Sequence, residues 1–176
     1  MSRSGYSDDF DGWASIRWRG AVTSAIKGKR GQAALREILA ALDALPDKRL
    51  VADSLATAEG DYCTLGALGR ARGLDMAHID PEDRQAVAQT FGVAEALAAE
   101  IMYLNDDVVV DWQWVDVEIC GPMPPYHFPP YGRKEHWRTV RVPNPCAGEK
   151  RWRQMRNWVA SQLNPAPEQA AKEATA

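Results

Sequence analysis

The segment QAALREILAALDAL, residues 32–45, decides the fold class. Its large apolar residues recur every three or four positions, which is the spacing of one face of an α-helix. These positions are Leu35, Ile38, Leu39, Leu42 and Leu45. The pattern predicts an amphipathic helix that buries this face, and Pro46 ends the helix because proline cannot continue one.

Upstream of this segment, a second helix is expected to reach about Lys27. Asp11 is placed to cap its first turn, since aspartate accepts hydrogen bonds from free N–H groups at a helix start. Gly28 and Gly31 then bracket the basic pair 29–30, which predicts a basic turn between the two helices.

Downstream, helical spacing recurs in four more segments. In the first of them, LGALGRAR, the small residues Gly66, Ala67 and Gly69 would let another backbone come close. In the second, Asp80 is expected to cap the helix. The predicted ranges are 65–72, 80–91, 93–104 and 148–163.

Two other regions follow the period of two that a β-strand requires. Residues 49–56 and 61–64 flank a turn and predict a short β-hairpin. Residues 108–120 and 136–142 predict a longer two-stranded ribbon. The alternation changes phase after Trp114, which predicts a β-bulge.

Charges of opposite sign are expected to pair across the ribbon. The first strand carries acids and the second carries bases. These residues are Asp111, Asp116 and Glu118 on the first strand, and Arg138 and Arg141 on the second.

Together these segments predict an α+β fold that is mainly α-helical, with a single domain, a short β-hairpin and an inserted two-stranded β-ribbon. Residues 11–163 form the domain, and residues 108–146 are the inserted ribbon with its loop. Residues 1–10 are expected to be a flexible N-terminus, and residues 164–176 a disordered tail, because both are small or polar.

Composition narrows the class of protein. The chain has 176 residues, of which 45% are hydrophobic and 26% charged, values typical of a soluble globular domain. No apolar run approaches the roughly 18 residues that a membrane span needs. The first 13 residues contain no apolar core, so a secretory signal is not expected. Three cysteines without a Cys-x-x-Cys pair favour a reducing cytoplasm over a disulfide framework.

The net charge of −3 conceals three charged blocks. Residues 13–36 carry six bases and no acid, and residues 133–156 carry eight bases and two acids. Residues 80–118 carry ten acids and one base. The blocks either neutralise one another within the fold, which the low pI favours, or form a basic face for phosphate or an acidic face for a basic partner.

The stretch YCTLGAL, residues 62–68, and the later Leu104-Asn105-Asp106 carry a resemblance. With the closing tryptophan-bearing helix, they resemble a family of small uncharacterised proteins of bacteriophages and prophages. The likeness covers residues 13–106 and 147–163, so residues 108–146 are an insertion. The resemblance implies a phage or prophage origin and a location in the cytoplasm of a bacterial host. It implies no reaction.

The residues that could form a catalytic site or a metal site have simpler structural explanations. Cys63 precedes a predicted helix, whose N-terminus would activate a thiol, and Asn105 could orient a histidine base. The candidate bases are His78, His127 and His136. A buried core cysteine and a capped helix end explain Cys63 and Asn105 more simply. The acids of residues 80–111 follow no metal-binding spacing and are expected to form a solvated face. We therefore predict no catalytic residues, no metal and no cofactor.

The insertion has the strongest binding character, because aromatic residues gather there among prolines. The predicted partner-binding residues are Trp112, Trp114, Tyr126, His127, Phe128, Tyr131 and Trp137. The alternative is that one face of the ribbon packs on the helices, since a lone two-stranded ribbon needs something to pack against.

The first hypothesis is a non-enzymatic binding protein that engages a host or phage protein, in counter-defence for example. The second is a nucleic-acid-associated accessory protein that uses the basic blocks 13–36 and 133–156. Its phosphate contacts would be Arg17, Arg19, Lys27, Lys29, Arg30, Arg151, Arg153 and Arg156. The third is a cysteine-dependent hydrolase at Cys63. No membrane partner is expected, and the sequence assigns no oligomeric state.

Overall fold

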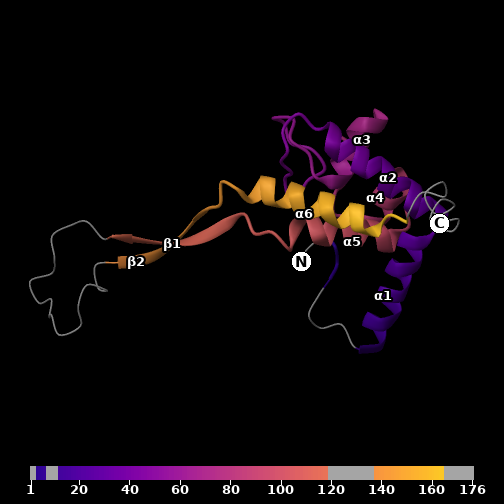
Figure 1. The fold of residues 1–176 in the computed structure, drawn as a ribbon, viewed down its shortest axis with the longest axis horizontal. Helices are drawn as coiled ribbons and strands as arrows, with labels where there is room; N and C mark the ends of the chain where they lie inside the picture. The colour runs from indigo at the N-terminus through magenta and orange to yellow at the C-terminus, as the bar shows by residue number, and fades with distance from the viewer. Residues whose placement is uncertain (1–2, 7–11, 119–136, 165–176) are drawn as a thin grey trace, which may run out of the picture.

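The computed structural model describes residues 3–6, 12–118 and 137–164. Within these ranges the chain forms six helices and one two-stranded antiparallel sheet, so the predicted mainly α-helical α+β domain is confirmed. In chain order the elements are α1 (Gly12–Lys27), α2 (Lys29–Ala44), α3 (Thr64–Arg72), α4 (Arg84–Thr90), α5 (Glu95–Asp106), β1 (Trp112–Glu118), β2 (Trp137–Pro143) and α6 (Ala147–Gln162) (Figure 1).

The helix α2 supplies the centre of the core, as its apolar spacing predicts. Leu35, Ile38 and Leu42 are completely buried, and α3 and α6 pack against α2. Burial of each such side chain contributes roughly 1.5–3 kcal/mol. The helix begins earlier than predicted, at Lys29, so the basic pair 29–30 lies in its first turn and does not form a separate turn.

The short helix α3 approaches another backbone closely, as its small residues predict. A Cβ atom on Gly66 would lie 1.7 Å from the carbonyl oxygen of Leu55. The Cys63 sulfur accepts a hydrogen bond from the Gly66 N–H at 3.4 Å and so caps the helix. Gly73 ends it with a left-handed φ of 68°.

The predicted hairpin over residues 49–64 forms only next to its turn, where the Cys63 N–H donates to the Leu55 carbonyl at 3.2 Å. Its segments share one isolated bridge, between Ala56 and Tyr62, and no continuous ladder. Asp53 adopts a left-handed φ of 59°, which turns the chain where an extended strand was expected. The segment is a loop held by single bonds, such as the one from Val51 N–H to the Tyr62 carbonyl at 3.1 Å.

Two helix ends also differ from the prediction. Asp83, not Asp80, caps α4, while Asp80 accepts from the N–H of Glu82 in a separate preceding turn. The helix α5 continues two residues beyond its predicted end, because Asn105 and Asp106 are buried and hydrogen-bonded within the fold.

The ribbon forms with an unbroken register, so the predicted bulge is wrong. Trp114 pairs with Arg141, and the next residue, Val115, pairs with Val140. The phase change in the sequence therefore places apolar residues on both faces of the ribbon. The ribbon tolerates this because it is not a layer of the core.

The predicted cross-strand ion pairs do not form opposite one another in the described part of the ribbon. Asp116 lies opposite Thr139 and accepts its hydroxyl hydrogen bond at 2.6 Å. Arg141 lies opposite Trp114, and its guanidinium carbon lies 4.4 Å from the ring centroid of Trp112. A hydrogen bond and a cation–π contact thus take the place of ion pairs.

Residues 3–6, expected to be flexible, are packed against the helical body. Arg3 and Ser4 are buried, and Arg3 forms an ion pair with Asp106. The Tyr6 hydroxyl donates to Glu100 and accepts from the Trp18 indole N–H at 2.6 Å. The predicted disordered tail, residues 164–176, is wrong at Asn164, whose N–H donates to the Gln32 side-chain oxygen at 2.8 Å. Residues 165–176 lie outside the described residues.

Candidate interaction surface

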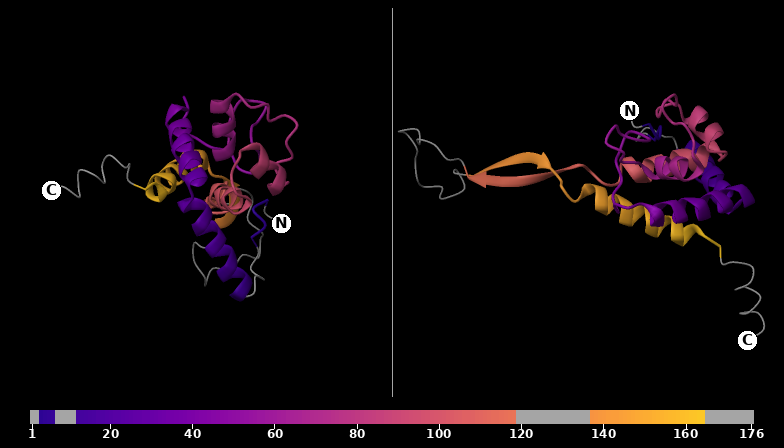
Figure 2. Two further views of the ribbon diagram at one scale, coloured as in Figure 1. Left: turned by 90° about the vertical axis from the view of Figure 1, so that its right-hand side faces the viewer. Right: turned by 90° about the horizontal axis from the view of Figure 1, so that it is seen from above.

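The ribbon extends away from the helices. In Figure 1 it leaves the body beside the start of α6, and the view from above in Figure 2 shows the same projection. The described strands β1 and β2 pair with each other, and neither forms a layer with any helix in these views. The alternative that one face of the ribbon covers the helices therefore does not apply to these strands.

The pairing register assigns every ribbon side chain to one of two faces, because directly opposite residues share a face. The tryptophan face consists of Trp112, Trp114, Asp116 and Glu118, with Thr139, Arg141 and Pro143 on β2. The valine face consists of Gln113, Val115, Val117, Arg138, Val140 and Val142.

The tryptophan face is ordered by contacts between its own side chains. The rings of Trp112 and Trp114 meet edge to face, with centroids 5.4 Å apart and an interplanar angle of 80°. Arg141 covers the other part of Trp112, while Trp114 remains 61% exposed. The side chain of Trp114 is therefore held in place and open to solvent.

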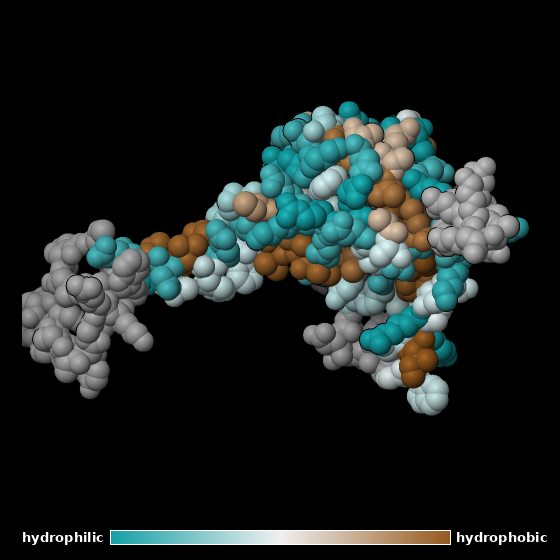
Figure 3. Space-filling view, in the orientation of Figure 1, coloured by the Kyte–Doolittle hydropathy of each residue, from teal (hydrophilic) through white to brown (hydrophobic). Residues whose placement is uncertain are grey.

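Large apolar side chains are also exposed on the valine face and in the stem of the ribbon, residues 108–111. Val115 and Val117 on β1, and Val108 and Val110 in the stem before it, are exposed large hydrophobic residues. Figure 3 shows apolar surface along the ribbon. Apolar surface of this kind is typical of a contact site in a folded protein.

Arg151 ties the stem of the ribbon to the helical body. Its side chain is 1% exposed. It donates to the carbonyls of Asn105 (2.6 Å), Leu50 (3.0 Å) and Val109 (3.0 Å), and to the carboxylate of Asp111 at 2.8 Å. Sequence reasoning missed this role. The available signal was spacing, since Arg151 shares a helix face with Met155 and Val159.

The predicted partner-binding residues fall into two groups. Trp112 and Trp114 lie together on β1, and Trp137 begins β2 opposite Glu118. The remaining predicted contacts belong to residues 121–132, which lie outside the described residues. The latter are Tyr126, His127, Phe128 and Tyr131.

Some of the predicted phosphate contacts are exposed in the structure, and others are ion-paired or buried. Those on α1 and at the start of α2 are exposed: Arg17, Arg19, Lys27, Lys29 and Arg30. On α6, Arg153 is exposed and Arg156 forms an ion pair with Asp43 at 2.6 Å. Arg151 does not belong to a basic surface, because it is buried with its donors engaged inside the protein.

Asn105 is the centre of a buried polar cluster in the helical body. Its side-chain oxygen accepts from the Thr64 N–H and hydroxyl, at 3.1 and 2.8 Å. Its amide donates to the Val51 carbonyl (2.8 Å) and to Asp106 (2.7 Å). Asn105 thereby joins α5 to α3 and to the loop at Val51, a role beyond the predicted helix end.

Arg3 completes this cluster from the N-terminal side. Burial works to lower the pKa of Arg3, but the hydrogen bond and charge of Asp106, with a contribution from Cys63, outweigh it and raise the pKa above its ordinary value. Burial also raises the pKa of Asp53, and the negative charge of Asp106 raises it further. The arginine is therefore held charged as the counter-ion of a buried carboxylate.

Of the histidine candidates only His78 lies within the described residues, and the exposed side chain of His78 contrasts with the buried Cys63. Cys63 is 1% exposed and caps α3, as the core alternative predicts. The His78 side chain is 90% exposed and contacts Asp75 at 3.9 Å. His127 and His136 lie outside the described residues.

No group of His, Cys, Asp and Glu within the described ranges is arranged to hold a metal ion. Within the same ranges, the helices are too short or too polar to cross a membrane. Comparisons of the chain with protein-family models, with curated proteins and with solved structures gave no match.

Proposed function

We propose that this chain is a non-enzymatic binding protein that engages another protein through its projecting ribbon. The observation that carries the proposal is the exposure of apolar side chains on both faces of a ribbon that stands clear of the core. The resemblance to phage proteins implies that the partner is a host or phage protein, and a counter-defence role suits that setting.

The location of the exposed apolar residues supports this proposal. Among the described residues, the exposed large hydrophobic side chains occur in only two places, the ribbon with its stem and the start of α1. An isolated two-stranded ribbon is marginally stable in water, and packing against another surface stabilises it. A protein partner would supply that surface.

The anchoring of the ribbon also favours binding. Arg151 bonds to two carbonyls of the body, those of Leu50 and Asn105, and to the Val109 carbonyl and the Asp111 carboxylate of the stem. The Asn144 N–H donates to the Asp111 carbonyl at 2.9 Å across the base of the ribbon. A ribbon that is held at its base loses less conformational freedom on binding than a free loop would.

Paired capture experiments test the proposal. The tagged full chain is used to capture proteins from cells of its source, beside Trp114→Ser and Val117→Asp, which alter one face each. We expect one protein to be retained by the unaltered chain and lost with at least one variant, because buried aromatic and aliphatic anchors carry most of an interface's binding energy.

The matched control is Ile16→Ser, which removes an equally exposed apolar side chain from α1. It should retain the same partner. Identical captured proteins for the unaltered chain, both ribbon variants and a deletion of residues 121–132 would contradict the proposal.

A further inference from the structure

Among the described residues, no acid forms an ion pair with the basic residues of α1 and α2. Residues 12–36 contain no acid, and all six bases in this range are exposed. The ion pairs found within the described ranges use other bases, such as Arg72, Arg84 and Arg156. The expectation that the charged blocks cancel within the fold therefore does not hold for this surface.

A cleft opens where α1 meets α2, next to the start of α5. Its volume is about 510 Å³. The cationic residues in its lining are Lys29 and Arg30, and all the others are small. These small residues are Ala21, Ser24, Ala25, Gly28, Gly31, Ala94 and Ala96.

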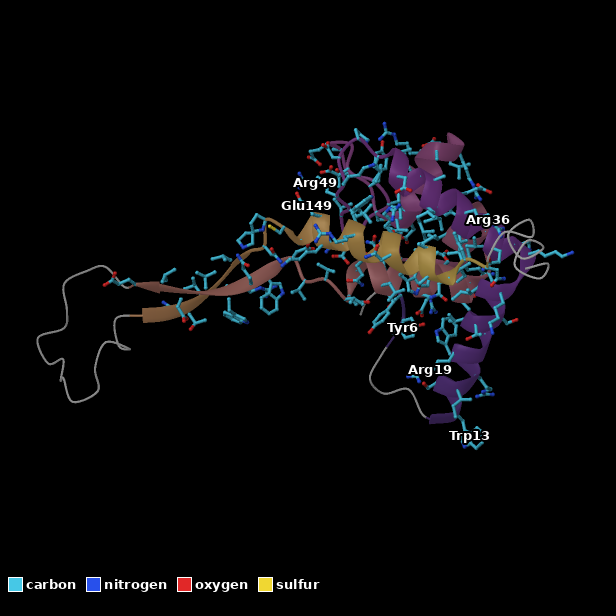
Figure 4. All side chains as sticks on the ribbon, in the orientation of Figure 1. Tyr6, Trp13, Arg19, Arg36, Arg49 and Glu149 are labelled. Atoms are coloured by element: carbon cyan, nitrogen blue, oxygen red, sulfur yellow. The ribbon has the colours of Figure 1, made fainter. Side chains whose placement is uncertain are left out.

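The helix α1 also presents an aromatic side chain to solvent. Trp13 is 77% exposed and Ile16 is 63% exposed. Figure 4 shows Trp13 at the far end of α1, with Arg19 on the same half of the helix, where α1 extends beyond the other helices. With 16 residues, α1 is about 24 Å long, which is enough to follow several nucleotides.

We infer that the α1–α2 surface binds single-stranded nucleic acid, with phosphates at Lys29, Arg30 and the bases of α1, and with a nucleobase stacked on Trp13. Cations beside an exposed aromatic ring are the elements of sequence-tolerant binding to single strands. This surface and ligand are separate from the ribbon and its protein partner.

The lining of the cleft favours nucleic acid over an acidic protein segment. Protein interfaces are held by large apolar anchors in fitted pockets, and this cleft contains no large apolar side chain. Small residues leave room for phosphate beside the two cations. The nearest acid of α5, Glu95, lies between two lining residues, and its carboxylate faces Arg84 at 3.8 Å.

The test measures fluorescence anisotropy of labelled oligo(dT) of about 12 nucleotides with the full chain, at salt from about 50 to 200 mM. We expect binding that weakens steeply with salt. The double variant Lys29→Gln/Arg30→Gln should weaken binding by about ten-fold and reduce the salt slope by about 1.4, because each lost phosphate contact on a single strand accounts for about 0.7. Trp13→Ala should also weaken binding by about ten-fold.

The matched control is Lys150→Gln/Arg153→Gln, which removes the same charge from exposed positions on α6. Its affinity should stay within about two-fold of the unaltered chain, since salt screens distant charges. Circular dichroism confirms that each variant is folded.

Three results would overturn the inference. The first is no binding at the lowest salt. The second is equal loss of affinity in the α6 control, which would indicate a general charge effect. The third is displacement by polyglutamate as effective as by unlabelled oligo(dT), which would assign the surface to an acidic protein segment.

Discussion

At the scale of single residues, the polar side chains that matter to this fold are buried ones. Arg151 and Asn105 each bond to several backbone groups from segments distant in sequence. Such groups are costly to leave unpaired, because a buried donor or acceptor without a partner forfeits its bonds to water. Substitution of either residue should therefore act on stability before it acts on any surface.

Arg151→Met is expected to lower the free energy of unfolding by about 3–5 kcal/mol, because it leaves several buried carbonyls without a donor. Urea unfolding followed by circular dichroism measures the loss. Arg153→Met, at an exposed position on the same helix, should change stability by no more than about 0.5 kcal/mol. Similar losses in the two variants would contradict the role assigned to Arg151.

Asp53→Asn tests the polar cluster through pH. Since burial raises the pKa of Asp53, ionisation of this carboxyl is less favourable in the folded chain than in the unfolded chain, and its charge opposes folding at neutral pH. The variant should gain about 0.5 kcal/mol or less at pH 7, a small value because the side chain is partly solvated.

This gain should disappear as the pH falls below about 4, where the carboxyl is protonated in both states. Unfolding measured at several pH values provides the check, with Asp47→Asn as an exposed control. A gain in the Asp53 variant that does not change with pH would contradict the assignment to charge.

At the scale of elements, the position of α3 depends on a close backbone approach, and the two faces of the ribbon depend on strand register. The helix α3 is positioned by contact of Gly66 with the Leu55 carbonyl, and a methyl group there would force the two segments apart. The ribbon is organised by its register, which separates a tryptophan face from a valine face. Both features follow from backbone geometry that composition alone does not describe.

Gly66→Ala should lower the free energy of unfolding by about 1–3 kcal/mol, because overpacking a tight contact shifts backbone or side chains. Gly20→Ala on α1 is the matched control, since no atom lies within 4 Å of its added Cβ. The control should gain about 0.5–1 kcal/mol from better helix propensity. Thermal unfolding of both proteins measures the difference, and an unchanged Gly66 variant would contradict the close approach.

At the scale of the whole molecule, the structure consists of a helical body and a ribbon that stands away from it. The core is built by α2 with the helices around it, and the ribbon joins that body at one base between Asp111 and Asn144. The two proposed surfaces lie on different parts of the molecule, with the ribbon on one side and α1 on the other (Figure 1).

Replacement of residues 112–143 by Asn-Gly should leave the helical body folded. The ends to be joined are already adjacent, because the Asn144 N–H bonds to the Asp111 carbonyl at 2.9 Å, and an Asn-Gly turn spans such a gap. The free energy of unfolding should change by less than about 1 kcal/mol, since the ribbon is not part of the core.

Urea unfolding measures the stability of this shortened chain, and the capture experiment should no longer retain the ribbon's partner. Binding of oligo(dT) should persist. A shortened chain that does not fold would show that the ribbon contributes to the core.

Periodicity in the sequence was sufficient for the helices and for the two strands of the ribbon, because burial of one helix face and alternation along a strand are local requirements. The leucine stripe of α2 and the small residues of α3 were both interpreted correctly. The same reasoning failed at Asp53, at the predicted bulge and at Arg151. In each case the outcome depends on segments that are distant in the chain.

Arg151 shows the physical reason most clearly. Within the basic run of α6 its charge indicates a surface. That charge is buried because the fold brings together the carbonyls of Leu50, Asn105 and Val109 and the carboxylate of Asp111. Likewise, local sequence predicts a ribbon but does not determine whether the ribbon lies on the helices or stands away from them. The packing of the body decides that, because it is complete without the ribbon.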